Sequence, residues 1–254
     1  MIHQALDVHL DLATQFYDLN RPAVAGDAYE FYRSHAVAAD GPILEPMCGT
    51  GRFLLPLLEE GLDVHGFDAS DRMLAALVAK ARLKNLTPRV WVSFAEDLVS
   101  EERYGLIFIP GGSFGLITDP LRVRAALEAM HRHLADDGVF VFEVISLDEI
   151  TRHAGTWRGL AFRRSDGATI VRSRLASVDG DVCALVSKYE LIQANAIVGT
   201  EVEELRVRLY DDPSSLAGLL EDVGFRDVRT MTAFDRSRAP SPGDDAVVFE
   251  CRKT

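Results

Sequence analysis

Short apolar runs alternate with longer amphipathic segments over the first 145 residues of this chain. The runs predict five buried strands, over residues 43–45, 63–67, 90–94, 106–109 and 139–144. Between them, apolar residues recur at helical spacing, and this spacing predicts helices over residues 52–60, 71–83 and 120–134. Strands that alternate with helices are typical of a parallel, doubly wound α/β sheet.

The pattern changes between about residues 159 and 210, where no helical period is found. Four shorter runs replace it, over residues 160–164, 169–176, 183–192 and 200–209. Turn residues separate the runs, and an Asp-Gly pair between alternating runs, as in Asp179-Gly180-Asp181, is typical of a β-hairpin. We therefore expect a small antiparallel sheet, inserted after the fifth strand of the larger one.

The α/β pattern resumes near the C-terminus with a predicted helix over residues 213–223 and strands over residues 228–232 and 246–251. No helix fits between these two strands, so we expect them to pair antiparallel. The first 40 residues predict one or two helices, with breaks near Asn20-Arg21-Pro22 and at Gly26. The predicted fold is a Rossmann-like, doubly wound sheet of seven strands with a terminal β-hairpin and a small antiparallel β insert.

Composition and charge narrow the classes of function. The 254 residues carry 27 Lys and Arg against 39 Asp and Glu, for a formal net charge of -12. An acidic chain repels phosphate backbones, and the densest basic stretches, 122–132 and 163–174, are interleaved with apolar residues and acids. These features count against a nucleic-acid partner.

Neither a membrane span nor a secretory signal is expected. No apolar run reaches the length of a transmembrane helix, and the N-terminal residues lack the pattern of a signal peptide. The three cysteines, Cys48, Cys183 and Cys251, are far apart and lack metal-ligand spacing, which predicts free thiols and no metal site. We therefore expect a cytoplasmic protein without membrane contact.

The most informative stretch is Ile43–Leu54, followed by Val64–Asp68. An apolar run ends in Glu45, a Gly-x-Gly turn follows, and a second apolar run ends in Asp68. In a βαβ unit such a turn lets the backbone approach a ligand, and an acid at the end of the second strand can accept hydrogen bonds from a ribose. Ser70 is the better N-cap for the next helix, so we expect Asp68 to be available for that role.

Six motifs in order make the chain resemble the class I S-adenosylmethionine (SAM)-dependent methyltransferases, over about residues 40–150 and 207–252. The motifs are Glu45-Pro46-Met47-Cys48-Gly49-Thr50-Gly51-Arg52, Gly66-Phe67-Asp68-Ala69-Ser70 with Met73-Leu74, Ala95-Glu96-Asp97-Leu98, Tyr104-Gly105-Leu106-Ile107 with Ser113-Phe114, Leu134-Ala135-Asp136-Asp137-Gly138, and Leu220-Glu221-Asp222-Val223-Gly224-Phe225. The insert after the fifth strand is loosely similar to that of small-molecule methyltransferases, including amino-sugar N-methyltransferases.

The resemblance implies three regions. Residues 1–40 would form a helical lid, residues 41–155 and 207–254 the SAM-binding core, and residues 156–206 the β insert. The insert would cap the acceptor or form the interface of a homodimer, because an exposed sheet edge favours a partner.

The resemblance also implies SAM as the cofactor and S-adenosylhomocysteine (SAH) as its product. Glu45 and the loop glycines would hold the amino-acid end, and Asp68 the ribose. The complete expected cofactor site is Tyr17, Glu45, Met47, Cys48, Gly49, Gly51, Arg52, Asp68, Ala69, Met73, Ala95, Glu96, Asp97, Pro110 and Gly111.

Three positions depart from the family pattern, and one of them, Gly105 in place of an acid after the aromatic residue of the fourth strand, is taken as neutral. Met47 replaces the first loop glycine, so the turn must accommodate a side chain there. Phe94 replaces the acid that often ends the third strand. Adenine recognition would then fall to Glu96, Asp97 or backbone amides, with Phe94 as an alternative wall of the adenine site.

In-line methyl transfer depends mainly on alignment of the reactants and exclusion of water. His153, Tyr17 and Glu143 are the candidates for a weak general base. A catalytic thiol at Cys48 is not expected, because the transfer forms no covalent enzyme intermediate. The expected acceptor site comprises Tyr29, Tyr32, Phe114, Trp157 and Tyr189, with Arg158 and Glu190 nearby.

The predicted reaction is methyl transfer to an O, N or C atom of a small molecule. An NAD-dependent oxidoreductase is one alternative, although Leu54 stands at the third glycine position of Gly-x-Gly-x-x-Gly. A non-catalytic SAM-binding regulatory protein is a second, which Met47 and Phe94 leave open. A nucleic-acid or protein methyltransferase is disfavoured by the acidic balance and by the lack of an Asn-Pro-Pro-Tyr-like loop after the fourth strand.

Overall fold

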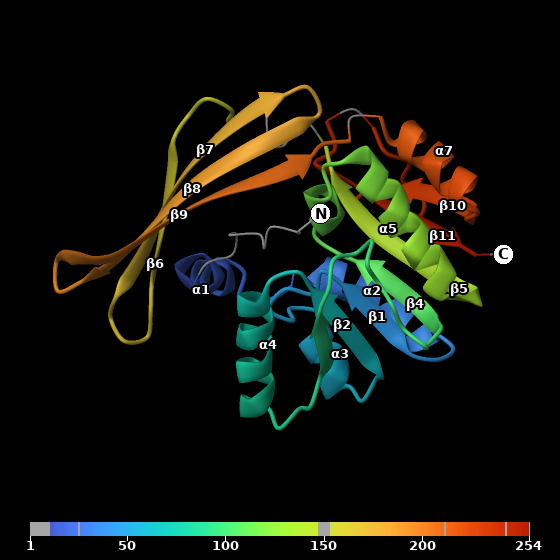
Figure 1. Ribbon diagram of the computed structural model, residues 1–254, viewed down its shortest axis with the longest axis horizontal. Helices are drawn as coiled ribbons and strands as arrows, with labels where there is room; N and C mark the ends of the chain where they lie inside the picture. Colours follow the sequence, from blue (N-terminus) through green and yellow to red (C-terminus); the bar gives the residue numbers. More distant parts are fainter. Residues whose placement is uncertain (1–10, 25, 147–152, 211, 242, 254) are drawn as a thin grey trace.

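The computed structural model describes residues 11–24, 26–146, 153–210, 212–241 and 243–253. Within them lie a seven-stranded sheet, in the order β10-β11-β5-β4-β1-β2-β3, and a separate four-stranded sheet, in the order β6-β7-β8-β9 (Figure 1). The predicted fold class, with its terminal hairpin and β insert, is therefore confirmed.

The large sheet is parallel in its first five strands and antiparallel at its C-terminal hairpin. Its strands are β1 (Ile43–Pro46), β2 (Val64–Asp68), β3 (Arg89–Val92), β4 (Tyr104–Ile109), β5 (Leu134–Ile145), β10 (Arg226–Met231) and β11 (Ala246–Arg252). Strand β11 pairs antiparallel with β10, as predicted for the last two strands, and it also pairs antiparallel with β5. The carboxyl ends of β1, β2, β4 and β5 therefore meet at one edge.

Helices cover both faces of this sheet. They are α2 (Gly26–Ala38), α3 (Leu54–Glu59), α4 (Asp71–Leu83), α5 (Pro120–His133) and α7 (Pro213–Val223), with a 3-10 turn η1 (Ser113–Leu116). The first helix, α1 (Asp11–Asn20), packs against α4 and the insert instead. Buried residues of α5 and α7 pack on one face, and those of α2, α3 and α4 on the other. Side-chain N-caps begin three of the helices, at Ser70, Asp119 and Asp212.

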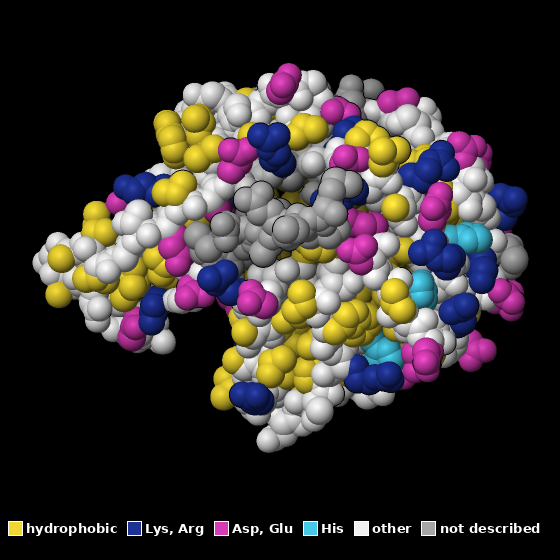
Figure 2. Space-filling view, viewed as in Figure 1, with side chains coloured by type: hydrophobic (Ala, Val, Ile, Leu, Met, Phe, Trp, Pro, Cys, Tyr) yellow, Lys and Arg dark blue, Asp and Glu magenta, His cyan; other side chains and the backbone are white. Residues whose placement is uncertain are grey.

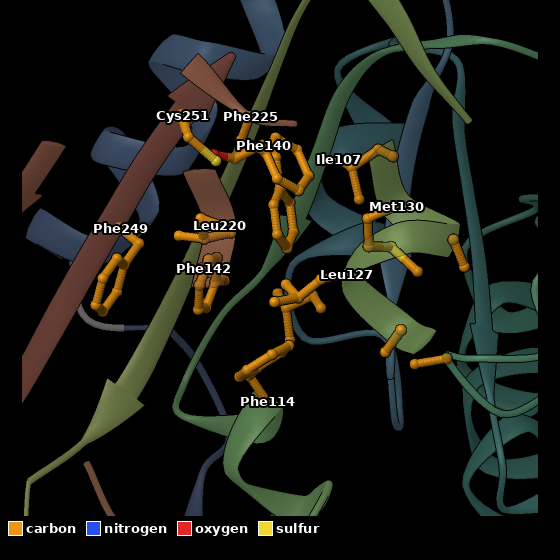
Figure 3. Close-up of a cluster of buried hydrophobic side chains, with 14 of the residues drawn as sticks. Ile107, Phe114, Leu127, Met130, Phe140, Phe142, Leu220, Phe225, Phe249 and Cys251 are labelled. Atoms are coloured by element: carbon orange, nitrogen blue, oxygen red, sulfur yellow. The ribbon is translucent and has the colours of Figure 1, made fainter. Parts of the chain in front are cut away.

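Stacked phenylalanines fill the face beneath α5 and α7 (Figure 3). Phe142 of β5 lies opposite Phe249 of β11, and their rings stack with centroids 5.0 Å apart. Phe140 stacks on Phe142 at 4.8 Å. Burying an aromatic side chain stabilises the fold by roughly 1.5–3 kcal/mol, so these rings hold β5 and its carboxyl end rigidly.

Strand β5 begins earlier than the sequence predicts. Residues 135–138, which the prediction left between the helix and the strand, lie inside the strand, because Leu134 pairs with Tyr104 directly after α5 ends. The next pair is Leu106 with Val139, so the intervening residues form an irregularity in the ladder rather than a connecting loop.

The insert is longer than predicted. Its strands are β6 (Arg158–Arg163), β7 (Thr169–Asp179), β8 (Val182–Gln193) and β9 (Ala196–Arg208). Ala194 and Asn195 both have positive φ, of 49° and 62°, and form a tight hairpin turn between β8 and β9. No glycine marks this turn, so the sequence pattern placed the start of β9 four residues too late.

Helix α1 lies between the insert and the core (Figure 1). The Phe16 ring packs edge-on against Phe162 of β6 and Tyr189 of β8, with centroids 5.3 and 5.5 Å apart. On the core side, Asp18 accepts hydrogen bonds from Thr50 and Lys80. The first helix thus ties the insert to the turn after β1. In the described part of the chain, no helix has the length and apolar content to cross a membrane.

Candidate active site

The turn after β1 bends at three residues with positive φ. They are Met47 (57°), Gly49 (54°) and Gly51 (79°). A Cβ on Gly51 would lie 2.8 Å from Cγ of Leu77 on α4, so glycine is required there for packing. A Cβ on Gly49 would meet no atom within 4 Å. The backbone at Gly49 therefore faces open space that a ligand can fill.

Met47 shows how the turn accommodates the missing first glycine. A side chain with left-handed backbone geometry costs about 1–2 kcal/mol, and Met47 adopts it while packing against the core beneath α5. Strain of this kind persists only where the surrounding structure holds it, and it is often found at binding sites. The departure from the family pattern thus keeps the shape of the turn.

Asp68 ends β2 with its carboxylate held by two backbone amides. Gly49 N–H donates to Oδ2 and Ser70 N–H to Oδ1, both at 2.8 Å. Ser70 caps α4 through the Met73 amide, as predicted, so Asp68 does not cap the helix. An ionised carboxylate is an acceptor-only group with about four lone-pair sites, which suits it to ribose hydroxyls.

Glu45 and Arg52 each have a buried polar atom without a hydrogen-bond partner. Glu45 is 2% exposed, and its Oε2 is unpartnered, as is Nε of Arg52. Burial raises the pKa of Glu45, and the nearby Arg52 opposes that rise. Leaving such atoms unsatisfied costs roughly 1–3 kcal/mol each. The charged end of an amino acid, with one ammonium and one carboxylate, fits this unsatisfied pair.

Glu143 lies near the end of β5 with its carboxylate buried. Its Oε1 accepts the Tyr32 hydroxyl at 2.7 Å and the Gly111 amide at 3.0 Å. Burial raises the pKa of Glu143, while the two hydrogen bonds and the cations Arg52 and Arg21 oppose the rise. Glu143 therefore holds the loop after β4, and its raised pKa suits a weak base.

Tyr17 lies over the turn from α1. The guanidinium groups of Arg21 and Arg52 lie 5.7 and 5.9 Å from the centre of its ring. Asp18 Oδ1 accepts the Thr50 hydroxyl at 2.5 Å and the Lys80 ammonium at 2.9 Å. These contacts bring Tyr17, Arg52 and the Gly-x-Gly turn together, as the sequence prediction requires.

On the expected adenine side, Phe94 and Glu96 both contact Arg122. The Arg122 guanidinium lies 5.1 Å from the centre of the Phe94 ring and pairs with Glu96. Glu96 is therefore engaged by a cation, whereas Asp97 is exposed. Ala95, directly before Glu96, is buried. The arrangement favours Phe94 as an apolar wall of the adenine site, which is the alternative that the sequence offered.

The remaining cofactor candidates lie along the same edge. Met73 and Cys48 are buried, and burial raises the pKa of the Cys48 thiol well above its usual range, which keeps it protonated and unreactive. Ala69 directly follows Asp68, and Pro110 and Gly111 directly follow β4. All of these residues adjoin the Gly-x-Gly turn or the strand ends beside it.

The acceptor candidates do not gather in one place. Tyr29 bonds Glu60 beyond the end of α3, at the opposite edge of the sheet, and Tyr32 is fully buried against Glu143. Phe114 is buried in the core, and Tyr189 is buried against α1 with its hydroxyl on Glu203. The last acceptor candidate, Trp157, is exposed directly before β6. His153, one of the candidates for a general base, is exposed nearby.

Two residues near this edge escaped the sequence analysis. Arg21 directly follows α1, and its guanidinium stacks on the Tyr17 ring. The only sequence signal near Arg21 was the predicted helix break beside it. The Tyr210 hydroxyl is buried without a partner, and its ring lies 6.3 Å from that of Phe114. Its amide bonds Ile145 O at the end of β5, a contact that no local pattern reveals.

Comparison with known proteins points to one family. Residues 43–138 match the family described as a methyltransferase domain. A curated protein from Geobacillus sp. (strain WCH70) that carries a methyltransferase name is 30% identical over 104 residues. The match covers 41% of this chain and 42% of that protein, less than half the length of either.

Several solved structures share the fold across almost the whole chain. A SAM-dependent methyltransferase from Clostridium acetobutylicum has a TM-score of 0.79 at 18% identity, over 94% of this chain and 96% of that one. The sugar N-methyltransferase KedS8 from Streptoalloteichus sp. gives 0.74 at 22%, over 94% and 92%. SAM-bound CalS10, an amino pentose methyltransferase from Micromonospora echinaspora, gives 0.69 at 17%, over 99% and 100%. The fold and the family resemblance expected from the sequence are confirmed.

Proposed function

We propose that this chain, whose residues 43–138 are a methyltransferase domain in the class I fold, is an enzyme that transfers a methyl group from SAM to a small molecule. One observation carries the proposal. Beside the open backbone at Gly49 lie Asp68, held by two amides, and the unsatisfied pair of Glu45 and Arg52. A ligand with a ribose and an amino-acid end would satisfy all of them.

The residues present fit that cofactor. Glu45 would meet the ammonium and Arg52 the carboxylate, while Asp68 would accept the ribose hydroxyls and Phe94 would wall the base. Tyr17 and α1 would cover the site, as a lid formed by residues 1–40 requires. When bound, SAM supplies an electrophilic methyl group on a sulfonium.

The chain itself contributes position and a weak base. The carboxylate of Glu143 is held by Tyr32 and Gly111 beside the loop after β4, where an acceptor would approach. A carboxyl group with a raised pKa can take a proton from an acceptor nitrogen or hydroxyl. Glu143 is therefore the preferred base, with Tyr17 as the second candidate; the exposed His153 stays a prediction.

Sugar-modifying relatives support a small, polar acceptor. KedS8 and CalS10 are described as sugar and amino pentose methyltransferases, and the shared fold covers 92% and 100% of their chains. We extend to this chain a small-molecule acceptor capped by residues 156–206. A homodimer through the same insert stays a prediction.

The NAD-dependent alternative fits less well. Leu54 is fully buried at the position of the third glycine, and a Cβ on Gly66 would lie only 2.6 Å from Leu54 Cδ1. The start of α3 is therefore packed against β2 by a leucine, whereas the dinucleotide fingerprint places a glycine there.

Calorimetry with SAH tests the proposal. We expect the wild type to bind SAH and Asp68→Ala to bind it at least tenfold more weakly, because about 1.5–3 kcal/mol is lost with each charged hydrogen bond. Asp71→Ala, an exposed change in the first turn of α4, is the matched control. No SAH binding by the wild type, or equal binding by Asp68→Ala, contradicts the proposal. NADH fluorescence titration separates the oxidoreductase alternative.

A further inference from the structure

Four arginines gather where the insert faces α1. Arg158 of β6 lies directly opposite Arg174 of β7, so their side chains share a face. Arg172 lies two residues before Arg174 on that same face, and its guanidinium lies 4.8 Å from the centre of the Phe16 ring. Arg21 follows α1. Like charges directly opposite each other on a sheet are destabilising, so some favourable interaction must offset the repulsion between these arginines.

In the part of the chain that the structure describes, this cluster forms no ion pair with a carboxylate. Arg174 Nε donates to Ser187 Oγ at 2.8 Å, and Arg172 Nε is buried without a partner. Burial and then the neighbouring Arg174 lower the pKa of Arg172 to about 10, so it stays charged at neutral pH. The charge of Glu203 raises the pKa of Arg172, but Glu203 also accepts the Tyr189 hydroxyl. Within the described residues, no carboxylate pairs directly with Arg158, Arg172 or Arg174.

Ion pairs are common elsewhere in this acidic chain, so arginines without a paired carboxylate stand out. Arginines on the core pair with acids, as Arg33 does with Glu60 and Arg236 with Glu250. On the face shown in Figure 2, Lys and Arg side chains lie interspersed with Asp and Glu. In a chain with a net charge of -12, arginines on this face of the insert that pair with no carboxylate among the described residues indicate a site that is completed by an anion.

The cluster adjoins the proposed active site. Arg21 and Arg52 flank the Tyr17 ring, and Arg52 Nη2 lies 3.5 Å from the position of a Cβ on Gly111. The charge of Arg21 acts on both Glu143 at the end of β5 and Arg172 on the insert. A molecule whose nucleophile approaches Glu143 can therefore extend toward the arginines.

We propose that Arg158, Arg172, Arg174 and Arg21 bind a phosphate group of the acceptor, which makes the acceptor a phosphorylated small molecule. Guanidinium groups match phosphate oxygens with paired hydrogen bonds, and several of them match a multiply charged anion better than a single carboxylate. The assignment of this anion to the methyl acceptor rests on the proposed function; the anion site itself does not.

Titration of the full-length protein with inorganic pyrophosphate at low salt tests the site. We expect binding that weakens as salt is raised, because the attraction is electrostatic. Arg158→Gln and Arg172→Gln should each weaken it about tenfold, the equivalent of one charged hydrogen bond. Arg132→Gln, an exposed change on α5, is the matched control and should leave binding unchanged.

The outcomes separate the two proposals. Absent pyrophosphate binding, or binding that Arg158→Gln leaves unchanged, overturns the site; Arg158 is exposed, so this variant does not depend on core packing. Succinate is titrated in parallel, and equal affinity for it overturns the assignment to phosphate. SAH binding is measured on the same samples. If SAH binds and pyrophosphate does not, only the proposed anion site is contradicted. If pyrophosphate binds and SAH does not, the anion site is supported and the proposed methyltransferase function is contradicted.

Discussion

The Tyr32 hydroxyl donates a 2.7 Å hydrogen bond to Oε1 of Glu143, across 111 positions of sequence. Tyr32 belongs to α2 and is fully buried, while Glu143 lies near the carboxyl end of β5. The same carboxylate oxygen accepts the Gly111 amide. A single buried carboxylate thus joins an N-terminal helix to the loop that would lie beneath the reacting groups.

Tyr32→Phe should lower the free energy of unfolding by about 1.5–3 kcal/mol, because it removes a buried hydrogen bond to an acidic group and leaves the carboxylate partly unsatisfied. Urea denaturation followed by circular dichroism measures the change. Tyr29→Phe is the control on the same helix: its hydroxyl bonds the partly exposed Glu60, and the change should cost less than about 1 kcal/mol. Equal losses in the two variants would show that the Glu143 contact is unimportant.

Gly51→Ala should destabilise the fold, whereas Gly49→Ala should mainly weaken SAH binding. At Gly51 a Cβ would meet Leu77 and also adopt positive φ, for an expected loss of about 2–4 kcal/mol. At Gly49 only the backbone strain of about 1–2 kcal/mol applies, but the methyl group would occupy space needed by the ligand. Thermal unfolding and SAH calorimetry on both variants distinguish the effects. Normal SAH affinity in Gly49→Ala would show that the ligand does not use this space.

Asp18→Ala should loosen α1 from the turn. The change removes the acceptor for Thr50 and Lys80, so we expect SAH affinity to fall about tenfold, the equivalent of one charged hydrogen bond. Hydrogen exchange of the α1 amides should become faster. Asp11→Ala on the same helix breaks only an exposed pair with Arg72 and should change neither readout. Unchanged exchange in Asp18→Ala would contradict a lid held by this residue.

Glu250 should make stability depend on acid pH. The His35 side chain, with a further contribution from Arg236, lowers the pKa of Glu250 from 4.5 to about 2. A lowered pKa in the folded state contributes stability above pH 4.5 that is lost as the pH falls toward 2. The contribution is about 3 kcal/mol at most, because a tenfold change in an acid dissociation constant corresponds to about 1.36 kcal/mol.

Denaturation of wild type and Glu250→Gln between pH 7 and pH 3 measures this effect. The gap in stability between the two proteins should narrow below pH 4.5. Glu221→Gln, an exposed change on α7, should stay parallel to the wild type across the range. A gap that is constant with pH would show that Glu250 titrates alike in the folded and unfolded chains.

Local signals in the sequence determined the order and type of most elements. Helices α4 (Asp71–Leu83) and α7 (Pro213–Val223) begin and end where predicted, because Ser70, Pro213 and Gly224 act on neighbouring backbone groups. Where no local signal marked a boundary, as at the start of β5 and β9, strand pairing decided it.

The same division holds at the site. The Gly-x-Gly turn and Asp68 could be found from the sequence, since one βαβ unit brings them together within 20 residues. Other contacts could not be predicted from the sequence, because each of them joins separate elements. They are the contacts of Tyr32 with Glu143, of Asp18 with Thr50, and of the insert's arginines with α1. Such contacts depend on how helices pack and strands register, and these are decided by burial of apolar surface over the whole fold rather than by the residues beside them in the chain.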